Sequence, residues 1–554
     1  MTYYSRKKTC IAKAIIAIVL GAGYSSISFA NELKYTIGVD SEAIFQDVFS
    51  EELQERINST NYIVKPRLSV NYETRRGNFN WTATHSHVRR DLDELSTTDN
   101  YTNYSYRAGV ELIDNLLNFN ASGALNYQTV SSGGFLVDNF LLNANNLSKT
   151  RSNRFGLNLD LPKGDYFGHR TQVNYSSTES EQREGAPGQL NSNVISINTS
   201  TFTGENFERL SAQLNTSFAI TDREEQGDYT NRLADVALSY RVKGNIGVIV
   251  TGTHEANQVA SESEAFSLLR DFNSIGAGII WRESDNKAIA LTWNRADNES
   301  VEVDEDNNGY IGVDINWAFN PRTQVSADYS RRFFGESGSF SFQHRIKRFR
   351  TQIQYTEEVT SFSQLIADPN NLGVFVCADG INDLASCFQP SSLNYQLAPN
   401  ETFVQFSDQN SEINDELILR KGLSWQVGTQ QRRTSVSLSG RYSTNEYLES
   451  DRLSRTYSAS TSVSFNIGQK TNIRWTTDAA FTDDILEGDS GSSDVYSSEL
   501  SLTRKLGRYF DLSLDFSYLD RTTEGRVVGG TATGLTGDLQ DRRISLNLKY
   551  TLNK

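Results

Sequence analysis

Residues 310–355 decide the fold: YIGVDINWAFNPRTQVSADYSRRFFGESGSFSFQHRIKRFRTQIQY. Apolar residues occupy every second position from Ile311 to Phe319, a period that places them on one face of an extended strand. The alternation is interrupted at residues 320–323 and at 335–337, where Asn, Pro, Gly and Ser are typical of tight turns. The stretch therefore predicts a meander of strands that must bury one apolar face, either against a second sheet or in lipid.

The same alternation recurs along the chain, for example at residues 64–72, 104–112, 457–467 and 544–552. A first run covers residues 33–39, and we expect a longer connection from there to Asn61. A chain of 554 residues usually suggests several domains, but its 25 tyrosines and 29 phenylalanines are spread evenly, as expected for one repetitive unit. We count about 24 such runs, each about 10 to 15 residues long, whereas a tilted strand needs roughly 9 to 11 residues to cross a bilayer.

The connections between these runs alternate in length. The even-numbered ones are tight turns, whereas most odd-numbered ones are long and rich in Asp, Glu, Asn and Ser. A soluble sandwich mixes connection lengths, but an outer-membrane barrel has short periplasmic turns and long extracellular loops. We therefore predict an all-β, antiparallel, up-and-down transmembrane β-barrel of about 24 strands, within a range of about 18 to 26. Aromatic residues that follow the short turns fit an interfacial girdle: Tyr166, Phe167, Phe207, Tyr509 and Phe510.

Residues 1–30 resemble a secretory signal, with a basic start at Arg6, Lys7 and Lys8, an apolar stretch, and small residues before position 31. A membrane-spanning helix needs about 20 apolar residues, and this run is shorter. We expect residues 31–554 to form a single barrel. The formal net charge of −15 becomes about −19 once the four basic residues of the signal are removed, which argues against a nucleic-acid partner.

One long connection, residues 363–411, contains Cys377 and Cys387. Their spacing in a secreted chain favours a loop disulfide, with a free pair as the alternative. Connections of this length are usually functional or disordered. The segment could fold inward as a constriction, face outward as a partner surface, or serve as a solvated tether.

Three local patterns suggest chemistry but have simpler explanations. Residues 488–491 spell Gly-Asp-Ser-Gly, as in serine proteases, but lie in a Gly- and Ser-rich loop with no nearby histidine. Residues 304–309 start like a calcium loop, but Ile315 replaces the acidic twelfth ligand. His85 and His87 share a strand face and could bind a metal, although a solvated pair is the simpler interpretation. We therefore expect no catalytic, cofactor or metal site, and no enzyme activity.

Charged residues alternate with the apolar set. They are tolerated inside a barrel only if water fills it or they pair across it. A barrel of about 24 strands is too wide for side chains to fill, so we expect a water-filled lumen. Its mixed but net acidic lining would disfavour small anions and would not exclude neutral or weakly charged sugar chains. Ten of the expected lumen-facing residues are Arg67, Glu111, Asp160, Arg241, Asp314, Asp328, Arg350, Arg474, Asp478 and Asp515.

Two segments resemble the outer-membrane β-barrel family associated with PEP-CTERM/exosortase systems. One comprises Arg331, Arg332, Phe333, Phe334 and Gly335, then Ser341, Phe342, Gln343, His344 and Arg345, then Tyr355, Glu357 and Glu358; the other comprises Pro66, Arg67, Leu68, Ser69, Val70 and Gly77. The resemblance implies a part in exopolysaccharide export or assembly and supplies no catalytic residues.

The leading hypothesis is a Gram-negative outer-membrane barrel that forms a wide passage for a polysaccharide. A general diffusion porin or surface-structural barrel is the runner-up, and an outer-membrane hydrolase is third. The expected partners are outer-membrane lipid and lipopolysaccharide, with periplasmic polysaccharide-export components as further candidates.

Overall fold

A computed structural model describes residues 32–50, 55–91, 97–129, 147–181, 190–224, 227–260, 268–284, 286–298, 309–361, 374–378, 401–405, 416–448, 450, 452–486, 489–525 and 538–553. No helix among these residues is long and apolar enough to cross a membrane.

Twenty-four antiparallel strands form one sheet. They are β1 (Glu32–Ser50), β2 (Glu55–Glu73), β3 (Gly77–Asp91), β4 (Thr97–Ile113), β5 (Leu117–Thr129), β6 (Leu147–Leu161), β7 (Phe167–Ser180), β8 (Asn191–Thr203), β9 (Leu210–Arg223), β10 (Asp228–Lys243), β11 (Ile246–Ala260), β12 (Leu268–Ser284), β13 (Lys287–Asn298), β14 (Gly309–Asn320), β15 (Thr323–Arg332), β16 (Gly335–Ile346), β17 (Phe349–Ser361), β20 (Leu417–Gln430), β21 (Thr434–Tyr447), β22 (Leu453–Asn466), β23 (Thr471–Leu486), β24 (Asp489–Lys505), β25 (Phe510–Gly525) and β26 (Leu539–Asn553).

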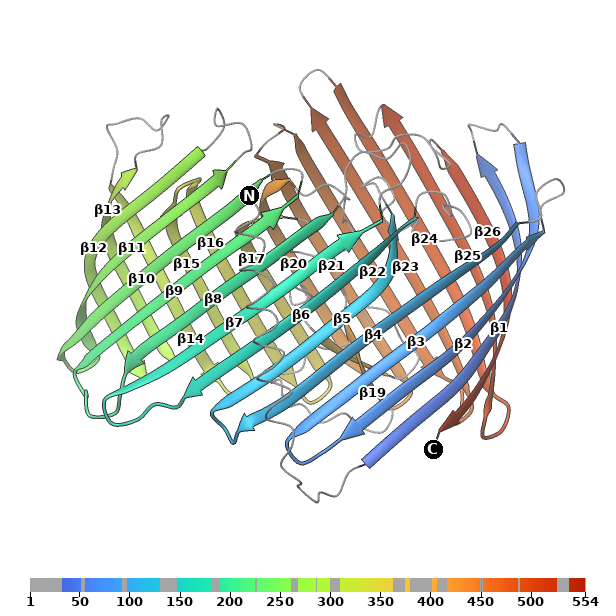
Figure 1. Ribbon diagram of the computed structural model, residues 1–554, viewed down its shortest axis with the longest axis horizontal. Helices are drawn as coiled ribbons and strands as arrows, with labels where there is room; N and C mark the ends of the chain where they lie inside the picture. Colours follow the sequence, from blue (N-terminus) through green and yellow to red (C-terminus); the bar gives the residue numbers. More distant parts are fainter. Residues whose placement is uncertain are drawn as a thin grey trace, which may run out of the picture.

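The sheet closes into a ring because β1 pairs with both β2 and β26, with Val39 opposite Pro66 on one side and Tyr550 on the other. Every other strand pairs with its neighbours in chain order, and β17 pairs directly with β20 (Figure 1). The predicted up-and-down barrel of about 24 strands is therefore confirmed. Closure leaves no strand edge unpaired, which is the requirement for a sheet that crosses a membrane.

The two ends of the barrel differ in their connections. At one end, strands are joined by turns as short as residues 244–245, 321–322 and 347–348. At the other end, connections reach the length of residues 130–146. The C-terminal end of β26 lies at the short-turn end (Figure 1). In outer-membrane barrels the short turns are periplasmic, so the opposite end, called here the loop end, is extracellular.

The outer face of the wall is apolar. Ile275, Trp293 and Phe319 are each more than 60% exposed, and similar residues recur at alternate positions on nearly every strand. The five aromatic residues of the predicted girdle are also exposed. Exposed apolar surface on this scale is unfavourable in water, because each Å² would cost about 25 cal/mol, so this face is matched to hydrocarbon.

A sharp corner of the wall lies at β12, where two glycines face inward. A Cβ at Gly276 would lie 1.7 Å from the side-chain oxygen of Asn294, and one at Gly278 would lie 1.9 Å from the backbone oxygen of Leu291. The missing side chains let β11 and β13 approach each other, and Thr251 of β11 donates a hydrogen bond of 2.9 Å to Asn294 of β13. The wall consequently bends tightly at β12.

Two local predictions were wrong. The turn expected at residues 335–337 lies instead at Phe333 and Phe334, because Gly335 already begins β16 and supplies a positive φ of 113°. The long connection expected between Val39 and Asn61 is mostly strand, since β1 continues to Ser50 and β2 begins at Glu55. Within the expected long loop, β18 (Val374–Ala378) and β19 (Glu401–Gln405) form a separate two-stranded sheet.

Candidate functional site

All ten of the predicted lumen residues lie on the strand face opposite the exposed apolar side chains. For example, Arg67 precedes the exposed Leu68, and Asp515 precedes the exposed Phe516. Strand alternation then directs these charged residues inward. The set is Arg67, Glu111, Asp160, Arg241, Asp314, Asp328, Arg350, Arg474, Asp478 and Asp515.

At the β12 corner, the inner face holds an ion pair that spans several strands. Arg332, at the end of β15, donates from Nε to Oε2 of Glu255 on β11 at 3.1 Å, and its Nη2 contacts Oε1. Three strands lie between β11 and β15 in the wall. The side chains therefore meet across the narrow end of the lumen, and this contact is called here the bridge.

The Glu255 end of the bridge is built into the wall. Its side chain is 0% exposed, whereas that of Arg332 is 24% exposed. Asn257 donates to Oε1 of Glu255 at 3.2 Å, and its own side-chain oxygen accepts hydrogen bonds from Tyr229 at 2.8 Å and Asn231 at 2.5 Å. A buried carboxylate is costly unless it is paired and hydrogen-bonded, and both conditions are met here.

Residues 330–339, called here the hairpin tip, comprise the ends of β15 and β16 and the turn that connects them. Apolar contacts hold this tip beside the bridge. Phe333 is buried and packs with Phe272 of β12 and Ala296 of β13. The guanidinium of Arg332 lies 5.1 Å from the ring centre of Phe334, within the range of a cation–π contact. The turn between β15 and β16 therefore places an arginine and two aromatic rings where the lumen narrows.

The hairpin tip pairs mainly with itself. The ladder between β14 and β15 ends at Val313 and Tyr329, and the ladder between β16 and β17 ends at Phe340 and Tyr355. Within the hairpin, pairing continues up to Arg332 and Gly335. Residues 330–339 can thus move without breaking the barrel wall.

Charges of both signs line the lumen. Asp314 and Asp328 are direct partners on β14 and β15, and Thr253 donates to Asp235 on β10 at 2.9 Å. Inward-facing arginines occur on β17, β20 and β21, at Arg350, Arg420 and Arg441, and Arg241 lies on β10 itself. The charge of the lumen is therefore mixed around the ring.

Strands β21 and β22 present hydroxyl groups to the interior. On β22 the outward positions include the exposed Tyr457 and Phe465, so the alternate positions face inward. The seventh inward position is Asn466, and the first six are all Ser or Thr: Ser454, Thr456, Ser458, Ser460, Ser462 and Ser464. Ser454, Thr456, Ser462 and Ser464 are buried, so Ser458 and Ser460, midway along the strand, are the hydroxyls of this row that are accessible. We call this surface the hydroxyl wall.

The chemical motifs of the sequence do not form a reactive centre in the described part of the chain. All five histidines hydrogen-bond to Thr or Asn, including His85 to Thr102 and His87 to Asn100, both at 2.8 Å. No cluster of three metal-ligating side chains occurs among the described residues. Ser490 is the second residue of β24 and pairs with Ile485, so it lies in a strand rather than in a loop.

Three predictions fall wholly or partly outside the described residues. Cys377 lies in β18, but Cys387 is not among the described residues, so the disulfide stays a prediction. The acidic residues of the calcium-like pattern, Asp304 and Asp306, and the signal segment 1–30 also lie outside them.

Sequence reasoning singled out Arg332 and Phe333 but missed Glu255 and Asn257. The sequence gives little indication that Glu255 forms an ion pair, because it does not distinguish this residue from the other inward-facing acidic residues of alternating strands. Its role follows from the corner at Gly276, which brings β11 opposite β15.

No model of a known protein family matches the chain, and no curated protein matches its sequence. Among solved structures it is similar to the FrpB iron transporter from Neisseria meningitidis, with 10% identity, 93% of this chain and 82% of that chain covered, and a TM-score of 0.41. The siderophore receptor PirA from Pseudomonas aeruginosa has 8% identity, coverage of 95% and 81%, and a TM-score of 0.36. OccK5 (OpdH) from Pseudomonas aeruginosa has 9% identity, coverage of 94% and 98%, and a TM-score of 0.30.

The chain's own geometry settles where it resides. A closed antiparallel ring pairs each strand of the wall with a neighbour on both sides, an apolar outer face meets hydrocarbon, and a charged inner face meets water. Even strand number and alternating connection lengths match the bacterial outer membrane. The protein is a transmembrane β-barrel of the Gram-negative outer membrane.

Proposed function

We propose that this barrel is a passage for an extracellular polysaccharide, with the bridge restricting one side of the lumen. The observation that carries the proposal is the hydroxyl wall. Uncharged hydroxyls both donate and accept hydrogen bonds. They can exchange partners with sugar hydroxyls one at a time, which favours movement over tight binding.

The hairpin tip supports the same proposal from a second direction. Residues 331–335 carry the resemblance to barrels linked to exopolysaccharide loci, and in the fold they include the arginine and the two aromatic rings of the bridge region. Under this proposal, the tip sets the width of the passage, and the short-turn end would receive the polymer from periplasmic export components.

Flux of neutral oligosaccharides into liposomes tests the passage directly. We expect wild-type protein to admit them, and Ser460→Ala to slow the longer ones more than the shorter ones, because only long chains span the hydroxyl wall. Thr461→Val is the matched control, since it removes a hydroxyl from the adjacent, outward-facing position of β22. Equal effects of the two substitutions would contradict a role for the wall.

A gene deletion distinguishes export from general permeability. We expect the deletion strain to lose surface polysaccharide, and complementation with the intact gene to restore it. Unchanged surface polysaccharide, together with reduced uptake of small solutes, would favour the runner-up, a diffusion porin. The observation that supports this second candidate is the mixed charge of the lumen.

A further inference from the structure

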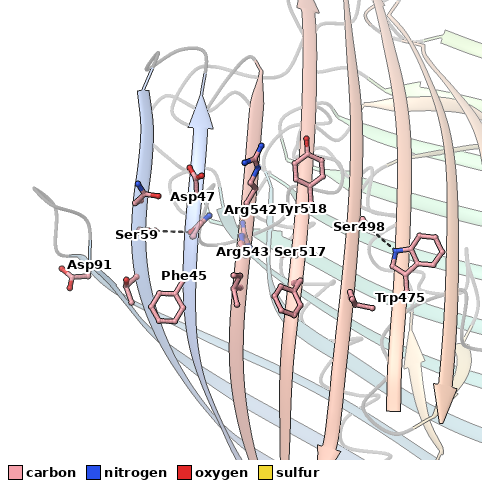
Figure 2. A pocket seen from close by; sticks show the side chains of 16 residues that line it. Phe45, Asp47, Ser59, Asp91, Trp475, Ser498, Ser517, Tyr518, Arg542 and Arg543 are labelled. Carbon is pink, nitrogen blue, oxygen red and sulfur yellow. Dashed lines mark hydrogen bonds between the residues drawn. The ribbon is translucent and has the colours of Figure 1, made fainter. Parts of the chain in front are cut away.

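A groove runs across the outer face of the wall near the loop end, over β1, β26, β25, β24 and β23 (Figure 2). Its volume is about 900 Å³, within the size range of sites that hold drug-sized ligands. It lies on the face that meets the membrane, so its occupant must come from the lipid phase or its boundary.

One side of the groove is a continuous apolar row. Each strand contributes one side chain, and every neighbour in the row is a direct cross-strand partner. The row consists of Phe45, Ile544, Phe516, Leu500 and Trp475. All five are exposed, which provides a surface for hydrocarbon chains.

The next row toward the loop end is polar. It begins with Asp47, Arg542 and Tyr518, again direct cross-strand partners, and continues to Ser498 (Figure 2). Ser498 accepts a hydrogen bond of 3.0 Å from the indole of Trp475. The groove therefore changes from apolar to polar over a single step along each strand.

Arg542 is the charge available to a ligand. It is exposed and forms no ion pair among the residues that the structure describes. The neighbouring Asp47 is already held by Arg56 at 3.0 Å. A second carboxylate, Asp91, lies at the far edge of the groove, three strands away from Arg542. The free charge beside the apolar row is thus positive.

We propose that this groove binds a phosphorylated glycolipid of the outer leaflet, with acyl chains along the apolar row and a phosphate at Arg542. The loop end faces the outside, so the adjacent lipid belongs to the outer leaflet, which in Gram-negative bacteria is lipopolysaccharide. Such a lipid combines hydrocarbon for the apolar row with a phosphate that forms charge-assisted hydrogen bonds to the guanidinium of Arg542.

Native mass spectrometry of the full-length protein in detergent tests the proposal. The probes are bis-phosphorylated lipid A, the same lipid A without phosphates, and phosphatidylglycerol. We expect wild-type protein to prefer the phosphorylated lipid A over both others by about tenfold, the usual effect of one charge-assisted hydrogen bond. Arg542→Gln should remove this preference, and Arg542→Lys should retain most of it.

Arg348→Gln is the matched control, because it removes another exposed arginine, from a turn at the opposite end of the barrel. It should leave the preference unchanged. The proposal is overturned if wild-type protein binds both forms of lipid A equally, if phosphatidylglycerol binds as tightly, or if Arg542→Gln keeps the wild-type preference. None of these outcomes depends on whether the lumen carries a polysaccharide.

Discussion

Replacing Arg332 by Gln should release the β15–β16 hairpin tip from the opposite wall. The substitution keeps a polar side chain of moderate length but removes the charge that compensates Glu255. Because Glu255 is fully buried, its carboxylate cannot recover the lost interaction from bulk water.

The structure sets the size of this effect. Breaking a buried ion pair by removing one partner costs about 3 to 5 kcal/mol. Asn257 still donates a hydrogen bond to Glu255, and the 24% exposure of Arg332 gives water some access. We therefore expect a cost at the lower end of this range, about 3 kcal/mol. That is about a hundredfold increase in the population of the opened tip.

Hydrogen exchange of the protein in nanodiscs measures that population. Peptides covering residues 330–339 should exchange about a hundredfold faster in Arg332→Gln, because opening precedes exchange. Peptides of β24 and β25, far from the bridge, should exchange at the wild-type rate. Planar-bilayer conductance should rise in parallel as the narrow end of the lumen widens.

The matched control is Asp160→Asn, which removes another ion pair inside the barrel. Asp160 and Arg170 lie 3.2 Å apart, but both are more than half exposed, so the pair contributes at most about 1 kcal/mol. The reasoning fails if both substitutions change exchange equally. It also fails if Arg332→Gln leaves residues 330–339 protected as in the wild type.

Three further substitutions test the wall and the lumen. Gly276→Val should lower the folding yield and should reduce the free energy of unfolding in urea titrations by about 1 to 3 kcal/mol, because the new Cβ collides with the corner. The control Gly422→Ala should be neutral, because nothing lies close to that glycine. Leu546→Arg should destabilise the barrel in lipid by about 2 to 4 kcal/mol, and Asn547→Arg on the inner face should cost clearly less; equal costs would refute the assignment of faces. Asp328→Asn should lower cation selectivity, read as a smaller reversal potential in a salt gradient, and an unchanged potential would place this carboxylate outside the ion path.

The alternation of apolar and polar residues along each strand was enough to predict most of the fold. An apolar residue at every second position fixes which face of a strand meets lipid, and a one-residue slip would reverse every side chain. Residues 311–319 illustrate this, since the expected outward residues Ile311 and Phe319 are exposed. The residue types typical of turns predicted the position of a turn less well where side-chain packing favours another position. The hairpin tip turned at Phe333 and Phe334 rather than at the following Gly-Glu-Ser, because Phe333 is buried against Phe272.

The class of structure, a membrane barrel of about 24 strands with a charged interior, thus follows from the sequence alone. Those properties depend only on period, count and connection length, all of which are local. The contact between Arg332 and Glu255 and the apolar row of five side chains from five strands become visible only in the folded barrel. The first contact depends on the curvature that Gly276 and Gly278 permit, and the second on strand register. Both are set by the closed ring as a whole, because closure fixes how every strand is offset from its neighbours.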